Sequence, residues 1–448
     1  METPRLEEVR LTSFKSFTEQ CLPLHDLTVL IGRNGSGKSN ALDGLMVLSR
    51  LALGEPVRDA LDGPRTEGEE PIRGGAEGCA PLGAGSFRLG CRVRSGEAVF
   101  DLDVEIAVRP EVRVLSERLT AVEGAPYGGR GRHLASGRVL LASDPAEPDR
   151  SDLTGRYFNG LRGRDPGLPF AADRLLTSQV PVRLPATTEA TKLVHRAASD
   201  VLSVLREVFL LDPVPHLMRR YVNERDTELR RSADNLSAAV NGLRRSDPEA
   251  FGRLTELVAG MPEYPVRGIS SVDTKLGDVQ LVLSEAGYHG RQHDVPARLL
   301  SDGMLRFLAF GAALLSAPVT DGEEGRSAAQ RHLVIEEVEN GLYPTQAARV
   351  LRLMKEESRR RSIDVLFTTH SPALLNSLTA EDHSGVVVCG RDPGSGESVL
   401  TRLTELPGYV DLMAAGDLGD AVARGRLPDA LRPREAAASD IEDFLRSL

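Results

Sequence analysis

A glycine-rich segment with the spacing of a phosphate-binding loop lies near the start of the chain, at residues 32–39, GRNGSGKS. It fits G-x-x-x-x-G-K-[ST], in which glycines let the backbone curl until several N–H groups face phosphate oxygens. Lys38 is suited to reach the outer phosphates and the Ser39 hydroxyl to hold Mg²⁺. We therefore expect ATP with Mg²⁺ to bind at Gly32, Asn34, Gly35, Ser36, Gly37, Lys38, Ser39 and Asn40.

Acidic and imidazole side chains follow two later apolar runs. Glu336 and Glu337 come directly after HLVI, and His370 lies just past DVLFT, within THSP. A carboxylate pair at the end of a buried strand suits metal and water chemistry, because one group engages the metal and the other orients or deprotonates the attacking water. An imidazole at the end of a strand is suited to donate to a phosphate. The alternative for the pair is a solvated strand end, and for the histidine an ordinary core or surface residue.

Strands and helices must position these groups, and the sequence predicts an α/β fold. The apolar run at 27–31 predicts a strand before the loop, and leucines at helical spacing predict a helix after it. Alternating residues predict strands at 86–93, 98–108 and 112–119, as the antiparallel part of a mixed sheet. Further strand patterns cover residues 6–11, 266–272, 278–284, 332–335, 364–368, 385–389 and 398–403.

The intervening segments are of two kinds. Residues 53–88 and 121–185 are rich in Gly, Pro and charge, which predicts irregular chain. Within residues 187–262, helical spacing at 187–208, 226–243 and 248–259 indicates a helical lid inserted into a nucleotide-binding domain. The expected division is an N-terminal ATPase lobe at 1–120, a mostly helical region at 121–265, a C-terminal ATPase lobe at 266–405, and a helical tail at 406–448.

Composition limits the class of protein. The net charge of −10 argues against a uniformly basic nucleic-acid binder, although DNA stays open as a partner through local patches. The basic loop at 128–133 is one such patch, and the favoured alternative for it is a solvated loop. The four scattered cysteines fit no zinc spacing and favour reduced thiols in a cytoplasmic protein. No apolar run of membrane-spanning length and no signal peptide is evident, so no membrane partner is expected.

In their order along the chain, these motifs resemble those of ABC-type ATPases. LSDGMLR, at residues 300–306, is similar to that family's signature LSxGxxR. The resemblance implies that Ser301 and Gly303 press on the γ-phosphate held by another subunit, so that the protein is at least a homodimer joined through ATP. It also implies a catalytic set of Lys38, Glu337 and His370, and a metal set of Ser39 and Glu336. Glu336 stands where the family usually has Asp.

Other segments extend the resemblance. A first strand followed by FKSF, at 14–17, resembles the head of SMC, Rad50 and RecF ATPases, and this implies that Lys15 approaches a phosphate; the alternative is a surface lysine. Residues 339–344, ENGLYP, resemble the D-loop that lies along the dimer seam. Arg73 lies either near the γ-phosphate or on a plain surface turn. The glutamine that the family places near Mg²⁺ stays unassigned among Gln179, Gln280 and Gln292.

The phrases IEEVENGLYP and TTHSPALLN resemble compact bacterial AAA family ATPases of the OLD-like and RecF-like groups. Many such relatives work in anti-phage defence beside a separate nuclease or toxin, as in the Septu and PARIS systems. The expected fold is a P-loop ABC-type ATPase head with a mixed β-sheet, an antiparallel β subdomain and an inserted helical lid.

The first hypothesis for the function is an ATPase that dimerises around ATP and regulates a separate effector protein, since the 78 residues after His370 leave no room for a Toprim nuclease. A RecF-like, ATP-dependent DNA-binding repair ATPase is the second hypothesis. A scaffold with structural ATP is the third.

Overall fold

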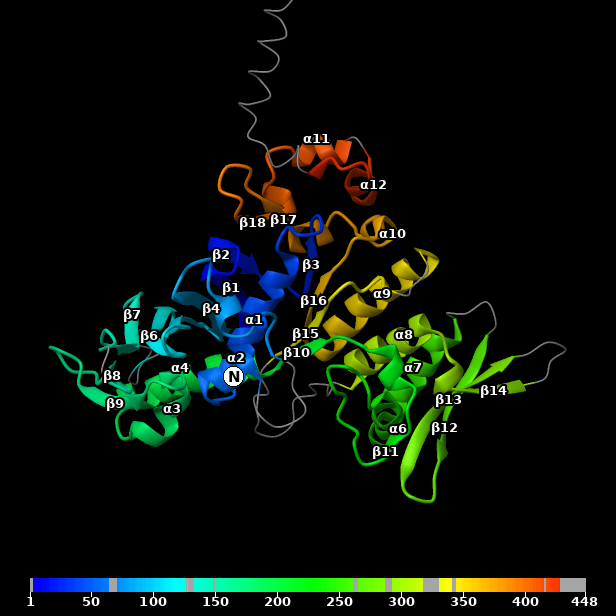
Figure 1. Ribbon diagram of the computed structural model, residues 1–448, viewed down its shortest axis with the longest axis horizontal. Coiled ribbons are helices and arrows are strands. Elements are labelled where there is room, and N and C mark those ends of the chain that lie inside the picture. Colours follow the sequence, from blue (N-terminus) through cyan, green and yellow to red (C-terminus); the bar gives the residue numbers. More distant parts are fainter. Residues whose placement is uncertain are drawn as a thin grey trace, which may run out of the picture.

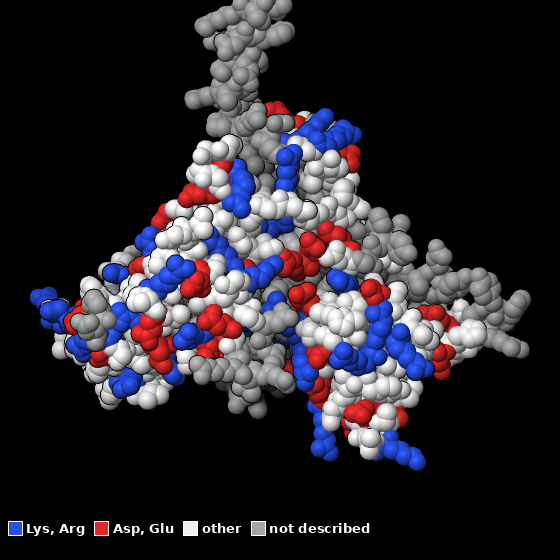
Figure 2. All heavy atoms as spheres, viewed as in Figure 1, with Lys and Arg blue, Asp and Glu red and all other residues white. Residues whose placement is uncertain are grey.

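The structure is a computed structural model that describes residues 3–63, 71–125, 127, 133–147, 150–260, 265–286, 292–316, 330–340, 344–414 and 416–427. The chain folds around one large mixed sheet with helices on both faces, and a smaller sheet lies to one side (Figure 1). No helix within these ranges is long and apolar enough to cross a membrane. On the face seen in Figure 2, basic side chains are interspersed with acidic ones.

One end of the large sheet is parallel. Its strands, in spatial order, are β10 (Val208–Leu211), β15 (Arg331–Ile335), β16 (Ile363–Thr368), β3 (Leu27–Ile31) and β17 (Val386–Arg391). Leu30 of β3 packs into the core on one face, while Val29 and Ile31 pack into a second core on the other. Burial on both faces explains why these strands read as continuous apolar runs.

The sheet continues into a long antiparallel part. Its strands, in spatial order, are β18 (Ser398–Arg402), β2 (Phe17–Pro23), β1 (Arg5–Phe14), β4 (Ser86–Ser95), β5 (Ala98–Ala107), β6 (Arg113–Glu123), β7 (Arg138–Ser143), β8 (Asp152–Tyr157) and β9 (Gly167–Ala171). The one parallel contact among them joins β18 to β2 at Ser398 and Phe17. The predicted α/β class, with a mixed sheet and an antiparallel part, is confirmed.

Two predictions about strands were wrong. Residues 121–185, expected as irregular chain, contain β7, β8 and β9, which add three antiparallel strands to the edge of the sheet. These strands are only five or six residues long and include Gly155 and Pro169, so their own sequence signal is weak. The sequence also did not predict strand β2. This strand pairs with β1 across the tight turn at Lys15 and Ser16.

Helices cover both faces of the sheet. On the face of Leu30 lie α1 (Lys38–Ala52), α2 (Val57–Asp62), α3 (Leu176–Arg183) and α4 (Glu189–Arg206). On the face of Val29 lie α6 (Leu236–Ser246), α7 (Pro248–Ala259), α8 (Asp302–Leu315), α9 (Pro344–Arg361) and α10 (Pro372–Leu375). The short elements α5 (Pro215–Met218), η1 (Glu77–Cys79), η3 (Ala297–Leu299), η4 (Asp382–Gly385) and η5 (Leu403–Glu405) connect them.

The small sheet lies beside α6 and α7, at the right of Figure 1. It contains β11 (Val222–Asn223), β12 (Val266–Asp273), β13 (Asp278–Ala286) and β14 (Gln292–Pro296), with β13 paired to the other three. The predicted division placed a boundary between residues 265 and 266. Strand β11 comes before this boundary and pairs with β13, which comes after it, so the small sheet contains parts of both predicted regions.

The predicted helical lid therefore needs correction. Its first part contains the strands β7, β8 and β9, in a region expected to be mostly helical, and α4 packs on the large sheet. The helix expected at 226–243 begins only at Leu236, because the buried side chain of Asn235 bonds the backbone of Asp226, Glu228 and Arg230 and holds that segment in a turn. The tail folds as α11 (Tyr409–Ala414) and α12 (Leu418–Ala423), and residues 428–448 lie outside the described ranges.

Candidate nucleotide site

The glycine-rich loop joins the end of β3 to the start of α1, as its sequence predicts. Gly32, Gly35 and Gly37 have φ values of 154°, 76° and 118°. A Cβ on Gly37 would lie 2.3 Å from Ser398 Oγ, and one on Gly32 would lie 2.1 Å from the carbonyl oxygen of Cys389. At Gly32 and Gly37, both the backbone conformation and the close packing therefore require glycine, whereas at Gly35 the backbone conformation alone favours it.

Strands β17 and β18 brace this loop from the side. The Ser36 carbonyl accepts a hydrogen bond of 2.6 Å from Ser398 Oγ, and Arg391 Nε donates to the Gly35 carbonyl at 3.0 Å. Sequence reasoning missed both side chains. The only available signal was their place at the β17–β18 hairpin, which the sheet order brings beside β3.

A cavity of about 340 Å³ opens above the loop. It brings together Lys38, Ser39, Glu336, Glu337 and His370, which the sequence had singled out at three distant places. The remaining lining comes from Asn34, Gly35, Gly37, Asn40, Thr368 and Arg391. The parallel order of β15, β16 and β3 explains this convergence, because their carboxyl ends meet at one edge of the sheet.

Lys38 turns back toward the loop. Its ammonium donates to the carbonyl oxygens of Gly32, at 2.8 Å, and Arg33, at 3.2 Å. Burial lowers the pKa of Lys38, and the nearby carboxylates of Glu337 and Glu336 oppose that shift. A phosphate oxygen would supply the same kind of acceptor at this place, together with the negative charge that a buried cation favours.

Ser39 and Glu336 supply an all-oxygen corner of the cavity. The Ser39 hydroxyl donates a hydrogen bond to the Glu336 carboxylate. Hydroxyl and carboxylate oxygens are the ligands that Mg²⁺ prefers, and this ion usually completes its shell with phosphate oxygens and water. The residues present therefore fit the metal. Among the described residues, no group of three or more His, Cys, Asp and Glu side chains forms a self-sufficient metal centre.

Arg73 contacts the same corner. Its guanidinium lies 3.2 Å from each carboxylate oxygen of Glu336, and its Nε donates to Asp43 at 3.0 Å. Burial lowers the pKa of Arg73, but Asp43 and Glu336 outweigh burial and the net pKa is raised. Arg73 thus lies at the edge of the nucleotide site and not on a plain surface turn.

Glu337 is held from both ends. Its φ of 50° is in the left-handed region, where residues other than glycine are uncommon and which is often found at functional sites. Its backbone N–H donates to Thr368 Oγ1 at 2.8 Å, and its Oε2 accepts a hydrogen bond of 2.6 Å from the Asn340 amide. The rest of the expected D-loop, residues 341–343, lies outside the described ranges.

His370 faces the cavity from the loop after β16. Its backbone N–H donates to the carboxylate of Glu339, which fixes the turn. Burial and, secondly, the charge of Lys38 lower the pKa of the imidazole, so its neutral form is favoured near neutral pH. A neutral ring keeps one N–H donor, which is the group that a phosphate oxygen requires.

Three predicted residues lie outside this cavity. The ammonium of Lys15 pairs with Asp43 at 2.8 Å and donates to the Arg73 carbonyl at 2.7 Å, so Lys15 is no free surface lysine and borders a neighbouring, larger cavity. Ser301 caps α8 by accepting from the Met304 N–H, and Gly303 lies in the first turn. Neither Ser301 nor Gly303 lines the P-loop cavity of its own chain.

None of the three candidate glutamines reaches the cavity. Gln179 bonds the Ala171 backbone, Gln280 donates to the Arg219 carbonyl at 2.7 Å, and Gln292 is exposed on β14. The residues that sequence reasoning missed are instead Asp43 and Thr368, beside Arg391. Their types are common in helices and strands, and only the packing of distant elements gives them a role.

The sequence matches a known family. The family described as "AAA domain, putative AbiEii toxin, Type IV TA system" covers residues 27–123 and 153–376, which is more than half of the chain. No curated protein matches the sequence.

Among solved structures, the chain is similar to SMC heads. One is the SmcHead bound to the C-winged helix domain of ScpA, with 14% identity, a TM-score of 0.47 and coverage of 89% of this chain and 97% of that chain. The SMC head domain from Thermotoga maritima has 16% identity, a TM-score of 0.39 and coverage of 89% and 98%. The Smc head derived from Pyrococcus furiosus, bound to the C-terminal domain of ScpA, has 12% identity, a TM-score of 0.43 and coverage of 92% and 100%.

The residues matched by the family include the glycine-rich loop, the acidic pair and His370. This chain therefore belongs to the AAA-domain ATPase family described as putative AbiEii toxin, Type IV TA system.

Proposed function

We propose that this protein binds ATP with Mg²⁺ in the P-loop cavity, hydrolyses it, and closes into a dimer around it. The observation that carries the proposal is the convergence of Lys38, Glu337 and His370 with the Ser39–Glu336 pair in one cavity of about 340 Å³. Each group supplies a different part of phosphoryl transfer to water.

The chain's residues divide the chemistry as follows. The loop N–H groups and Lys38 hold the phosphates, with the N-terminus of α1 adding partial positive charge. Ser39 and Glu336 would hold Mg²⁺, which would supply positive charge against the phosphate oxygens. Glu337 orients a water molecule and takes its proton, and His370 donates a hydrogen bond to the terminal phosphate.

The signature helix supports a site shared between two copies. Ser301 and Gly303 form the N-terminus of α8, and a helix of this length offers free N–H groups and a favourable dipole to an anion. Because neither residue lines the cavity of its own chain, a second copy that brings α8 over the bound phosphates would complete the site.

We assign the dimer a regulatory role toward a separate effector protein, a nuclease or a toxin, in anti-phage defence. The family description names a putative toxin of a Type IV TA system, which favours a multi-component system over an isolated metabolic ATPase. DNA cleavage by the purified chain alone, with Mg²⁺ or Mn²⁺ supplied, would contradict this division of labour.

Phosphate release from ATP tests the enzymatic part. We expect turnover by the wild type and a loss of about 100-fold or more in Glu337→Gln, with ATP binding retained, because general-base catalysis contributes that much or more. Glu77→Gln, which changes an exposed carboxylate paired with Arg109, is the matched control and should keep wild-type turnover. Equal, near-zero rates in wild type and Glu337→Gln, with ATP bound, would favour a scaffold instead.

A further inference from the structure

Arg73 occupies the metal side of the nucleotide site. Its two terminal nitrogens fork onto the two carboxylate oxygens of Glu336, each at 3.2 Å, and one of them lies 3.4 Å from the Ser39 carbonyl. A guanidinium in this planar arrangement neutralises a carboxylate effectively. Glu336 therefore already has a cationic partner in this structure.

Two further contacts hold Arg73 in this position. Its Nε donates to Asp43 Oδ1 at 3.0 Å, and the other Asp43 oxygen accepts from Lys15 at 2.8 Å. Lys15 also donates to the Arg73 carbonyl at 2.7 Å. Asp43 is buried in α1, so the helix that carries the phosphate-binding loop also anchors Arg73 through a single carboxylate.

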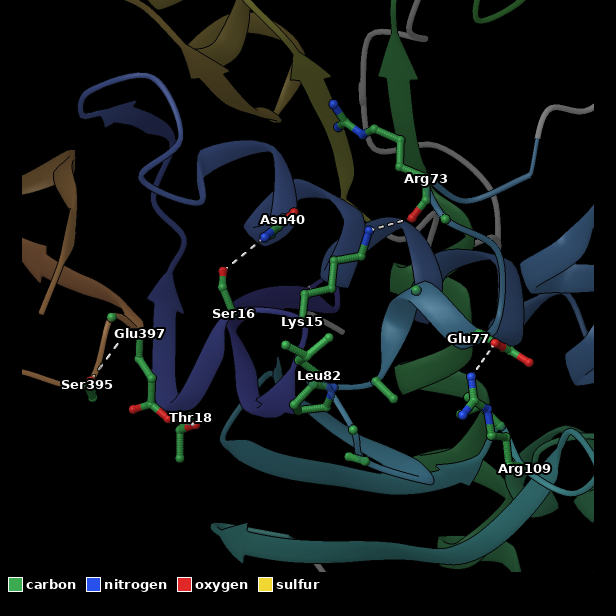
Figure 3. A pocket seen from close by; sticks show the side chains of 18 of the residues that line it. Lys15, Ser16, Thr18, Asn40, Arg73, Glu77, Leu82, Arg109, Ser395 and Glu397 are labelled. Atoms are coloured by element: carbon green, nitrogen blue, oxygen red, sulfur yellow. Dashed lines mark hydrogen bonds and ion pairs between the residues drawn. The ribbon is translucent and has the colours of Figure 1, made fainter.

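The segment around Arg73 forms the wall of the larger cavity, of about 990 Å³, which borders the P-loop at Asn40. Figure 3 shows the Arg73 carbonyl facing Lys15, while its guanidinium points away from the other lining residues. The same wall carries the exposed Glu77–Arg109 ion pair and the fully exposed Leu82. A movement of Arg73 would thus act directly on a surface that faces solvent.

Mg²⁺ and Arg73 require the same oxygens of Glu336. Mg²⁺ and the Arg73 guanidinium cannot both bind the Glu336 carboxylate fully. The guanidinium already contacts both carboxylate oxygens, and two cations repel each other at this distance. We propose, on the basis of the proposed MgATP site, that Arg73 is an internal counter-ion of Glu336 that Mg²⁺ must displace. Arg73 then sets how strongly ATP binding depends on the metal. Its displacement also loosens residues 71–84, the wall of the larger cavity, when the metal binds.

Arg73→Ala tests this directly through ATP affinity measured with Mg²⁺ and again with EDTA, using a fluorescent ATP analogue. Without Arg73, the bare Glu336 should repel phosphates in EDTA, and Mg²⁺ should bind without displacing a cation. The ratio of the dissociation constant in EDTA to that in Mg²⁺ should therefore rise about 10-fold above the wild-type ratio, as expected for removal of one partly buried charge contact. Arg73→Lys, which keeps the charge but loses the fork, should give an intermediate ratio.

Arg109→Ala is the matched control. Arg109 lines the same larger cavity and pairs with Glu77 of the wall, but it does not line the P-loop cavity. Its ratio should equal that of the wild type. An unchanged ratio in Arg73→Ala, or a loss of affinity confined to the Mg²⁺ condition, would overturn the counter-ion role and leave the proposed ATPase function intact. Absence of ATP binding by the wild type would overturn the proposed function, and this inference with it.

Hydrogen exchange gives a second readout that does not depend on affinity. In the wild type, exchange of the backbone amides at residues 71–84 should rise with ATP and Mg²⁺ but not with ATP and EDTA. In Arg73→Ala, the two conditions should give equal exchange. Faster exchange at residues 71–84 of the wild type with ATP and EDTA would contradict this inference, because it would show that the nucleotide, and not the metal, loosens this segment.

Discussion

The side-chain amide of Asn340 donates a hydrogen bond of 2.6 Å to Oε2 of Glu337. Glu337 has left-handed backbone torsions, and its N–H is fixed by Thr368 Oγ1 on the neighbouring strand. Thr368 therefore fixes the backbone and Asn340 fixes the carboxylate. Because Glu337 lines the cavity, this arrangement makes Asn340 a positioning residue for the proposed base.

Removing the Asn340 side-chain amide should slow ATP hydrolysis without weakening ATP binding. We expect Asn340→Ala to reduce turnover about 10-fold, the loss expected for one charge-assisted hydrogen bond, while ATP affinity stays within about two-fold. In Asn340→Asp, a second carboxylate beside Glu337 should move the rising limb of the pH–rate profile to higher pH, because a neighbouring like charge raises a carboxyl pKa. Identical pH–rate profiles in the wild type and Asn340→Asp would show that Asn340 does not act through Glu337.

Gly37→Ala should disrupt the phosphate-binding loop. The new Cβ would lie 2.3 Å from Ser398 Oγ at a φ of 118°, so strain and overlap combine. We expect a loss of about 1–3 kcal/mol in the free energy of unfolding, with ATP affinity lowered as well. Gly83→Ala is the control for strain alone, since its φ is 82° and no atom lies within 4 Å of its Cβ. Thermal unfolding and ATP titration should separate the two variants; equal effects would contradict the role given to Ser398.

Stability should fall as pH rises, partly because of Glu117. This buried carboxyl group accepts hydrogen bonds from the N–H groups of Leu176 and Thr177 at the start of α3. Burial raises the pKa of Glu117 from 4.5 to about 7, against the effect of those hydrogen bonds. The folded state therefore holds this proton more tightly than the unfolded chain, and the resulting stability is full below about pH 4.5 and lost as pH rises through about 7.

Thermal unfolding of Glu117→Gln between about pH 5 and pH 8 checks this prediction. Gln cannot titrate, so the decline of Tm with pH should be shallower in this variant than in the wild type. Glu105→Gln, on the adjacent strand β5, should keep the wild-type slope. A slope in Glu117→Gln equal to that of the wild type would rule out Glu117 as the titrating group.

The parts of the site that the sequence could predict are those with local signals. The loop before α1, the acidic pair after β15 and His370 after β16 each follow an apolar run, and each run became a parallel strand. Because parallel strands end at a common edge, local patterns sufficed to bring these residues together. Asp247 and Ser301 were likewise predictable as helix N-caps from their side chains alone.

The parts that could not be predicted depend on long-range order. Arg391 braces Gly35 from 356 positions away, and Asp43 matters only because Lys15 and Arg73 meet around it. Strands β7, β8 and β9 have little amphipathic pattern of their own. Their structure is decided by pairing, of β7 with β6, of β8 with β7 and of β9 with β8. In each case the partner in space, and not the neighbour in sequence, determines the role.

The mass of Glu337→Gln in solution, with and without ATP and Mg²⁺, tests the central claim most directly. This variant should bind ATP without hydrolysing it, so a shared site predicts a shift from monomer to dimer, or between larger assemblies, when both ligands are present. The double variant Lys38→Ala with Glu337→Gln should show no shift, because the phosphates lose their main cationic contact. A mass that is the same with and without ATP and Mg²⁺, in protein shown to bind ATP, would contradict the ATP-closed dimer and the role given to Ser301 and Gly303.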